Sequence, residues 1–250
     1  MKVLTNAGVQ GETGSLKAIS RDIHYTIAGR DSTKPLLAFV HGSPGSSSNF
    51  LQYATDTVLL NRFQVLLIDR PGYGGSDFGQ VDRSMESQAA EIAALIRNFT
   101  ADSIFLVGHS LGGPIICRMA MDNPEQFSGL LIIAGSVDPD LEPDEPWRST
   151  LDKKIFSWVL PRSFRVSNRE IMPAVSELHK MDSLWPRITC DVIILQGEED
   201  ELVPPGNADY AEKMLINADV LKVMIPFENH FIPFTQPEMV REYILNLAGS

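Results

Sequence analysis

The pentapeptide Gly108-His109-Ser110-Leu111-Gly112 directly follows the apolar run Ile104-Phe105-Leu106-Val107 and precedes a plausible helix from Pro114 to Met121. This order places a serine on a sharp turn between a buried strand and a helix. Small residues flank such a serine because side chains at the glycine positions would collide with the neighbouring strand or helix. The pattern therefore predicts a serine hydroxyl that stands exposed at the end of a strand.

The rest of the chain alternates short apolar runs with helical patterns. Runs without polar alternation are typical of strands covered on both faces, and such runs separated by helices indicate an α/β fold with a parallel sheet. A hairpin of residues 16–19 and 23–27 is also expected near the start. The helical stripe between residues 85 and 99 consists of Met85, Ala89, Ile92, Ala93, Ile96 and Phe99. The apolar runs are Leu36–Val40, Val65–Ile68, Ile104–Val107, Leu130–Ala134, Val192–Leu195 and Val220–Ile225.

Composition limits the classes of partner and site. A chain of 250 residues, 44% of them hydrophobic, fits one α/β domain. The formal charge of −11 would repel nucleic-acid backbones and anionic lipid surfaces. Cys117 and Cys190 form no C-x-x-C pair, so neither a disulfide framework nor a metal site is expected.

The distribution of apolar residues indicates where in the cell the protein is located. Residues 1–20 lack the pattern of a signal peptide, and no run approaches the ~20 apolar residues of a membrane span. We therefore expect a cytoplasmic protein, a monomer or homodimer, that acts on a small molecule and has no nucleic-acid or membrane partner.

The serine turn and the order of elements around it resemble the α/β-hydrolase superfamily over nearly the whole chain. The resemblance implies a mostly parallel sheet of about eight strands with helices on both faces, a serine nucleophile and no cofactor. Because the nucleophile is Ser110, the related haloalkane dehalogenase and epoxide hydrolase chemistries, which use an aspartate, are not expected.

One long stretch, residues 137–187, interrupts the alternation and is too long for an ordinary connection. Many members of the superfamily insert a helical cap at this point. We interpret residues 1–136 and 188–250 as the core and residues 137–187 as a cap insertion, although the stretch could also be a surface excursion that packs on the core. Its aromatic residues Trp147, Phe156 and Trp158 could line a substrate pocket or form the internal core of the cap.

A serine hydroxyl needs a base within hydrogen-bond reach and an acid that orients the base. Of the five histidines, only His230 lies on a loop between the last expected strand and the last helix, where superfamily members similarly place the triad histidine. His109, beside the serine, and Phe231, beside His230, are candidate pocket residues.

The acid of the triad has two candidates. The segment from Gly197 to Pro204 resembles the family's G-x-x-D-x-x-V-P turn, and Asp200 occupies the aspartate position. Asp138 is the alternative. It follows the expected strand Leu130–Ala134, and some members of the superfamily carry the acid after the corresponding strand.

The oxyanion of a tetrahedral intermediate also needs donors. Leu111 should supply one backbone N–H, since it follows the nucleophile. The second should come from Ser43, because His41-Gly42-Ser43-Pro44-Gly45 resembles the family's H-G-x-P-G loop and Pro44 has no N–H. A further turn, residues 69–76, resembles the family's D-x-x-G-x-G-x-S turn and is assigned a structural role.

Together these residues predict a serine hydrolase that acts on a small ester or related acyl substrate through Ser110, His230 and Asp200. Carbon–carbon bond hydrolysis, aminopeptidase activity and perhydrolysis use a similar triad and stay open. A member of the fold that binds a ligand without turnover is the alternative outside catalysis.

Overall fold

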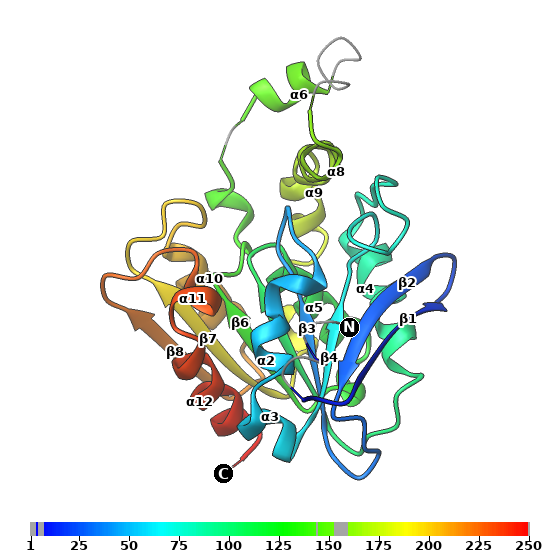
Figure 1. Ribbon diagram of the computed structural model, residues 1–250. Coiled ribbons are helices and arrows are strands. Elements are labelled where there is room, and N and C mark those ends of the chain that lie inside the picture. Colours follow the sequence, from blue (N-terminus) through cyan, green and yellow to red (C-terminus); the bar gives the residue numbers. More distant parts are fainter. Residues whose placement is uncertain (1–3, 5–7, 144, 153–159, 250) are drawn as a thin grey trace.

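The computed structural model describes residues 4, 8–143, 145–152 and 160–249 (Figure 1). Within these residues eight strands form one sheet, in the order β1-β2-β4-β3-β5-β6-β7-β8. β1, β2 and β4 pair antiparallel, and the other neighbouring pairs are parallel. The predicted α/β-hydrolase architecture is confirmed. The strands are β1 Gly11–Lys17, β2 Asp22–Ala28, β3 Leu36–Val40, β4 Gln64–Ile68, β5 Ile104–His109, β6 Gly129–Ile133, β7 Asp191–Gly197 and β8 Val220–Ile225.

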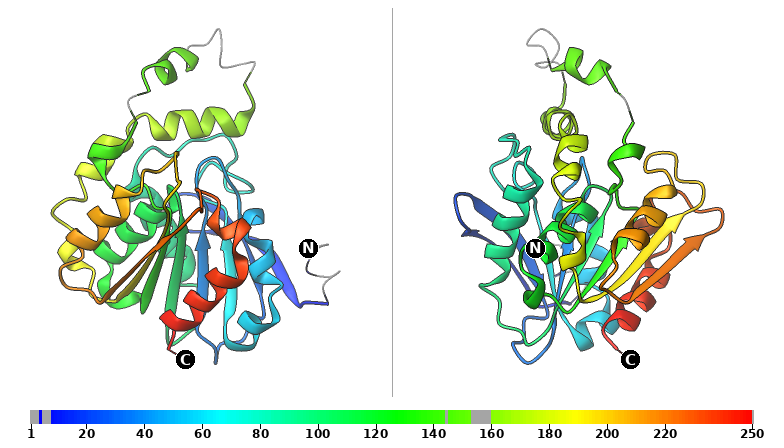
Figure 2. Two further views of the ribbon diagram at one scale, coloured as in Figure 1. Left: turned by 90° about the vertical axis from the view of Figure 1, so that its left-hand side faces the viewer. Right: turned by 180° about the vertical axis from the view of Figure 1, so that it is seen from behind.

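Helices cover both faces of the sheet (Figure 2). Side chains of β3 alternate between them: Leu36, Ala38 and Val40 pack in one apolar cluster with α4, α5 and α10, whereas Leu37 and Phe39 pack in a second with α2, α3 and α12. The α-helices are α2 Leu51–Ala54, α3 Thr57–Arg62, α4 Met85–Ile96, α5 Gly112–Asp122, α6 Trp147–Leu151, α8 Arg162–Ile171, α9 Ala174–His179, α10 Gly206–Met214, α11 Ile232–Thr235 and α12 Pro237–Leu247. The 3-10 helices are η1 Ser47–Phe50, η2 Pro124–Gln126, η3 Pro139–Leu141 and η4 Trp185–Arg187.

Local signals explain most element boundaries. The Ser84 side chain accepts a hydrogen bond from the Ser87 N–H at 3.2 Å and so caps α4. The apolar stripe of α4 then faces β2 and α5. One expectation holds only in part at the sheet edge. Val220 and Met224 of β8 pack against one apolar cluster, Val223 and Ile225 pack against the other, and Leu221 is 44% exposed.

The stretch from residue 137 to 187 has two parts in its described residues. α6 and α8 stand beyond the carboxyl ends of the parallel strands (Figures 1 and 2). η4 instead contacts α5, and Leu178 and Trp185, each 1% exposed, belong to the same apolar cluster as α4 and α5. Only the first part is therefore placed above the serine turn.

Candidate active site

Ser110 lies on the turn between β5 and α5, at the carboxyl end of the sheet. Its φ of 55° is in the left-handed region, which costs a residue with a Cβ about 1–2 kcal/mol. The glycines of the pentapeptide are needed for space. A Cβ at Gly108 would lie 2.5 Å from the Gly112 carbonyl oxygen, and one at Gly112 would lie 2.2 Å from the Val40 carbonyl oxygen. The turn thus presents the serine only with glycines on both sides.

His230 and Asp200 approach this turn from the loops after β8 and β7. His230 Nδ1 donates to Asp200 Oδ2 at 2.8 Å, and the other carboxylate oxygen accepts the N–H groups of Leu202 at 2.9 Å and Val203 at 2.8 Å. Burial opposes ionisation of Asp200, but the hydrogen bonds from His230 and the backbone outweigh it and lower the pKa of the carboxyl group. The carboxylate is therefore held ionised, with His230 in the tautomer whose Nε2 is free to accept a proton.

His109 contacts His230 through a hydrogen bond and through its ring. Its Nε2–H donates to the His230 carbonyl oxygen at 2.9 Å, and the two rings lie 4.7 Å apart. Burial, followed by the neighbouring His230, lowers the pKa of His109 to about 4. His109 is therefore neutral near pH 7 and acts as a fixed donor.

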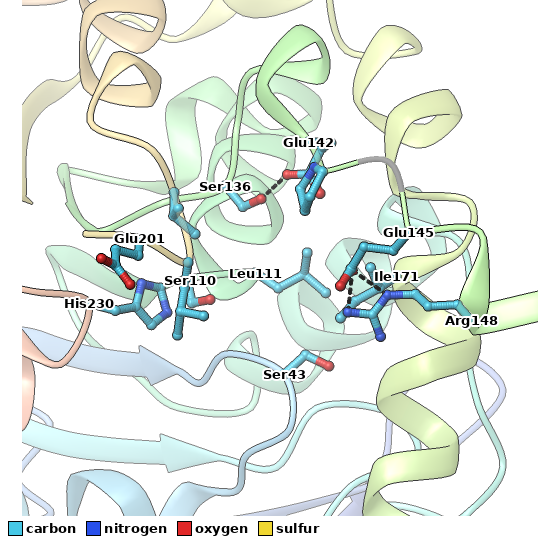
Figure 3. Close-up of a pocket in the computed structure, with 13 residues that line it drawn as sticks. Ser43, Ser110, Leu111, Ser136, Glu142, Glu145, Arg148, Ile171, Glu201 and His230 are labelled. Carbon is cyan, nitrogen blue, oxygen red and sulfur yellow. Dashed lines mark hydrogen bonds and ion pairs between the residues drawn. The ribbon is translucent and has the colours of Figure 1, made fainter. Parts of the chain in front are cut away.

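Ser110 and His230 lie next to one another and border the same cavity (Figure 3). Within the described residues no hydrogen bond joins the Ser110 hydroxyl to the imidazole. Such bonds are often long or poorly aligned without substrate and tighten only in the complex. The structure thus brings together Ser110, His230 and Asp200, the residues that the sequence predicts as nucleophile, base and acid.

Asp138, the rival acid, points elsewhere. Its carboxylate accepts the Asp140 N–H at 2.9 Å, and its own N–H donates to Asn207 Oδ1 at 2.9 Å. The carboxylate beside His230 is that of Asp200.

The two residues expected to supply the oxyanion donors border the same cavity. Ser43 and Leu111 both line the cavity in front of Ser110 (Figure 3). In the part of the chain that the structure describes, neither backbone N–H has a hydrogen-bond acceptor. Leu111 also directly precedes α5, whose N-terminus favours negative charge.

Two cavities of about 290 Å³ each meet at the serine, and both are bordered by Ser43, Ser110, Leu202 and His230. We call them the charged cavity and the aromatic cavity. The charged cavity is lined further by Leu111, Ser136, Glu142, Pro143, Glu145, Arg148, Ile171, Glu201 and Val203. The aromatic cavity is lined further by His41, Gly42, Pro44, Gly45, Asn49, Phe50, His109, Phe231 and Phe234.

The pocket residues expected from the sequence are distributed unevenly. His109 and Phe231 line the aromatic cavity. Trp147 borders neither cavity among the described residues; it is 44% exposed, and the Arg148 guanidinium lies 4.6 Å from its ring. Phe156 and Trp158 lie outside the described residues.

The charged cavity has a polar wall that was not predicted from the sequence. Arg148 pairs with Glu145 at 2.5 Å, three residues earlier, and Glu142 accepts a hydrogen bond from Ser136. Oppositely charged residues three apart at the start of α6 were the available signal. Burial, partly offset by the Ser136 hydroxyl, raises the pKa of Glu142.

Two kinds of feature are absent from the described residues. No helix there is long and apolar enough to cross a membrane. That same part of the chain also contains no group of three or more His, Cys, Asp or Glu side chains that could hold a metal ion.

A profile of the family described as "alpha/beta hydrolase fold" matches residues 35–161. The chain belongs to the α/β-hydrolase family. Among curated relatives, this α/β-hydrolase is 29% identical over 111 residues to the sn-1-specific diacylglycerol lipase ABHD11 of Mus musculus, covering 44% of this chain and 36% of that protein. It is 31% identical over 103 residues to the pimeloyl-(acyl-carrier protein) methyl ester esterase of Aeromonas hydrophila, and this match covers 41% of this chain and 38% of that protein.

The α/β-hydrolase chain thus spans less than half the length of these curated relatives. A solved structure of a thermophilic esterase from Thermogutta terrifontis superposes with a TM-score of 0.69 over 95% of this chain and 100% of that chain, at 19% identity, and shares the fold. Family membership and the curated relatives support hydrolase activity.

Proposed function

We propose that the protein is a cofactor-independent serine hydrolase that acts on a small ester or related acyl substrate. One observation carries the proposal: the 2.8 Å pair of His230 and Asp200 lies beside a serine on a strained turn, where two cavities meet. This is the arrangement that activates a serine hydroxyl near neutral pH.

In the proposed reaction, Ser110 Oγ attacks the substrate carbonyl carbon while His230 Nε2 accepts the hydroxyl proton. The N–H groups of Ser43 and Leu111 stabilise the oxyanion. His230 then donates its proton to the leaving group, and the acyl group stays on Ser110 as an ester. A water molecule attacks that ester by the same route and releases the acid and the free serine.

The two cavities favour a small substrate with two different ends. We propose that the acyl group occupies the charged cavity and that the leaving group occupies the aromatic cavity. The polar wall formed by Glu142, Glu145 and Arg148 disfavours a long alkyl chain, because such a chain would desolvate these groups without replacing their hydrogen bonds. We further propose that the part of residues 137–187 containing α6 and α8 acts as a cap.

A series of 4-nitrophenyl esters tests the proposal. The wild type should hydrolyse the acetate faster than the octanoate and release a burst of 4-nitrophenol equal to the enzyme present, whereas folded Ser110→Ala should do neither. Faster cleavage of an amino-acid 4-nitroanilide than of any ester would favour the aminopeptidase alternative. If wild type and Ser110→Ala are equally inactive on every substrate, ligand binding without turnover replaces this proposal.

A further inference from the structure

A buried ion pair joins α8 to the loop after β4. Glu170, near the end of α8, is 4% exposed, and Arg70 is fully buried. Both terminal guanidinium nitrogens of Arg70 donate to the two carboxylate oxygens of Glu170, one of them at 3.2 Å. Tyr73 Oη donates to Glu170 Oε2 at 2.6 Å, and Gln88 Nε2 donates to Oε1 at 2.7 Å. Burial opposes the charge on Glu170, but Arg70 outweighs it and lowers the pKa of Glu170.

The other side of this network contacts the loop that carries the expected oxyanion donor. Arg70 Nη2 donates to the Gly42 carbonyl oxygen at 2.9 Å, and His41 Nδ1 donates to the same oxygen at 2.7 Å. His41 Nε2 accepts the Arg70 backbone N–H at 3.0 Å, so His41 is neutral with its proton on Nδ1. Because the Tyr73 proton is directed to Glu170, the Ser43 hydroxyl donates to Tyr73 Oη at 2.7 Å.

The Gly42 carbonyl and the Ser43 N–H belong to one peptide unit. In a trans peptide these two groups point in opposite directions, so holding the oxygen fixes the direction of the N–H. Two donors, one of them a guanidinium, also draw electron density toward the carbonyl oxygen and strengthen the N–H as a donor. The network thus orients the Ser43 N–H, which would bind the oxyanion, by contacting the carbonyl oxygen on the opposite side of the same peptide.

We infer that Glu170 is a positioning residue for the oxyanion hole. It orients Arg70 and Tyr73, and these two residues hold the Gly42–Ser43 peptide with its N–H toward the reacting carbonyl oxygen. Glu170 comes from α8, outside the sheet, so the position of α8 determines how well the transition state is bound. The inference rests on the proposed function, since it requires an oxyanion.

Two variants and a matched control test this inference with 4-nitrophenyl acetate. Glu170→Gln removes the charge that orients Arg70, and Tyr73→Phe removes only the hydroxyl between Glu170 and Ser43. Glu177→Gln is the control, because Glu177 is a buried carboxylate of α9 in the same stretch whose Oε2 accepts the Met85 N–H at 3.0 Å. Misplacing rather than deleting a donor should lower kcat about 10- to 100-fold in Glu170→Gln and about 3- to 10-fold in Tyr73→Phe, with little change in KM.

A second measurement separates positioning from general loss of structure. A short alkyl trifluoromethyl ketone forms a tetrahedral adduct whose oxyanion needs the hole, so its inhibition constant should rise by the same factor as kcat/KM falls. The matching methyl ketone should bind all variants equally, and Glu177→Gln should resemble wild type in kcat even if it unfolds more easily. The inference is wrong if folded Tyr73→Phe and Glu170→Gln keep wild-type kcat and trifluoromethyl ketone affinity, or if Tyr73→Phe alone folds and keeps them. If wild type itself neither hydrolyses the ester nor binds the trifluoromethyl ketone more tightly than the methyl ketone, the proposed function fails instead.

Discussion

Replacing Asp200 with asparagine should nearly abolish turnover and leave the fold intact. Asp200 Oδ1 accepts the N–H groups of Leu202 and Val203, so an asparagine must keep its carbonyl oxygen on that side. Its NH2 group then faces His230 Nδ1, which lies 2.8 Å from the other oxygen in the native site. His230 Nδ1 becomes an acceptor and its proton moves to Nε2, the nitrogen that would have to take the proton of Ser110.

The wrong tautomer of a triad histidine lowers kcat by ~10⁴, or about 5 kcal/mol of transition-state stabilisation. The assay is kcat with 4-nitrophenyl acetate at neutral pH, with near-ultraviolet circular dichroism to check the fold. Asp138→Asn is the matched control, because its side chain accepts the Asp140 N–H and no other hydrogen bond from the described residues, and its kcat should stay within about twofold of wild type. If Asp200→Asn keeps more than about a tenth of the wild-type kcat, or if Asp138→Asn loses as much activity as Asp200→Asn, Asp200 does not set the His230 tautomer.

Three further predictions concern strain, pH and charge. Ser110→Gly should unfold about 1 kcal/mol less easily than Ser110→Ala, since only glycine adopts a φ of 55° at little cost; equal urea midpoints would contradict this. Burial lowers the pKa of His41 to about 3 and that of His109 to about 4, whereas both imidazoles have a pKa of about 6.5 in the unfolded chain. Between these limits the unfolded chain binds more protons than the folded chain, so the stability of the folded state falls as the pH falls. Lowering the pH from 7 to 5 should thus cost about 2 kcal/mol per histidine in urea unfolding, and a total change below about 1 kcal/mol would contradict it. Glu142→Gln should raise kcat/KM for 4-nitrophenyl hemisuccinate and lower it for glycine 4-nitrophenyl ester by about tenfold each, because it removes a partly buried negative charge from the charged cavity; equal effects on both esters would rule this out.

The sheet could be predicted because its signals are local. A continuous apolar run such as Leu36–Val40 indicates a strand that is buried on both faces of a parallel sheet. The glycines around Ser110 indicate backbone atoms so close that a Cβ would not fit. His230 and Asp200 could be named because each follows its own strand, and parallel strands end at one edge of the sheet.

The walls of the site could not be predicted in the same way. Glu170 pairs with Arg70, which lies 100 residues earlier in the chain, and the sequence around each residue does not indicate that the two meet. The aromatic residues of the stretch from 137 to 187 suggested an apolar pocket, but Trp147 lies outside both cavities and Arg148, its neighbour, lines one. Which face of a short helix turns toward a site depends on tertiary packing, and the helical period of α6 spans too few residues to indicate it.

Covalent labelling by a fluorophosphonate, followed by intact-mass measurement, tests most directly whether His230 activates Ser110. It is run on wild type, Ser110→Ala and His230→Ala. We expect one adduct on wild type, none on Ser110→Ala, and labelling of His230→Ala that is slower by at least about a hundredfold, because the probe reacts only with an activated serine. Labelling of Ser110→Ala at the wild-type rate, or equal rates for wild type and His230→Ala, would contradict this expectation.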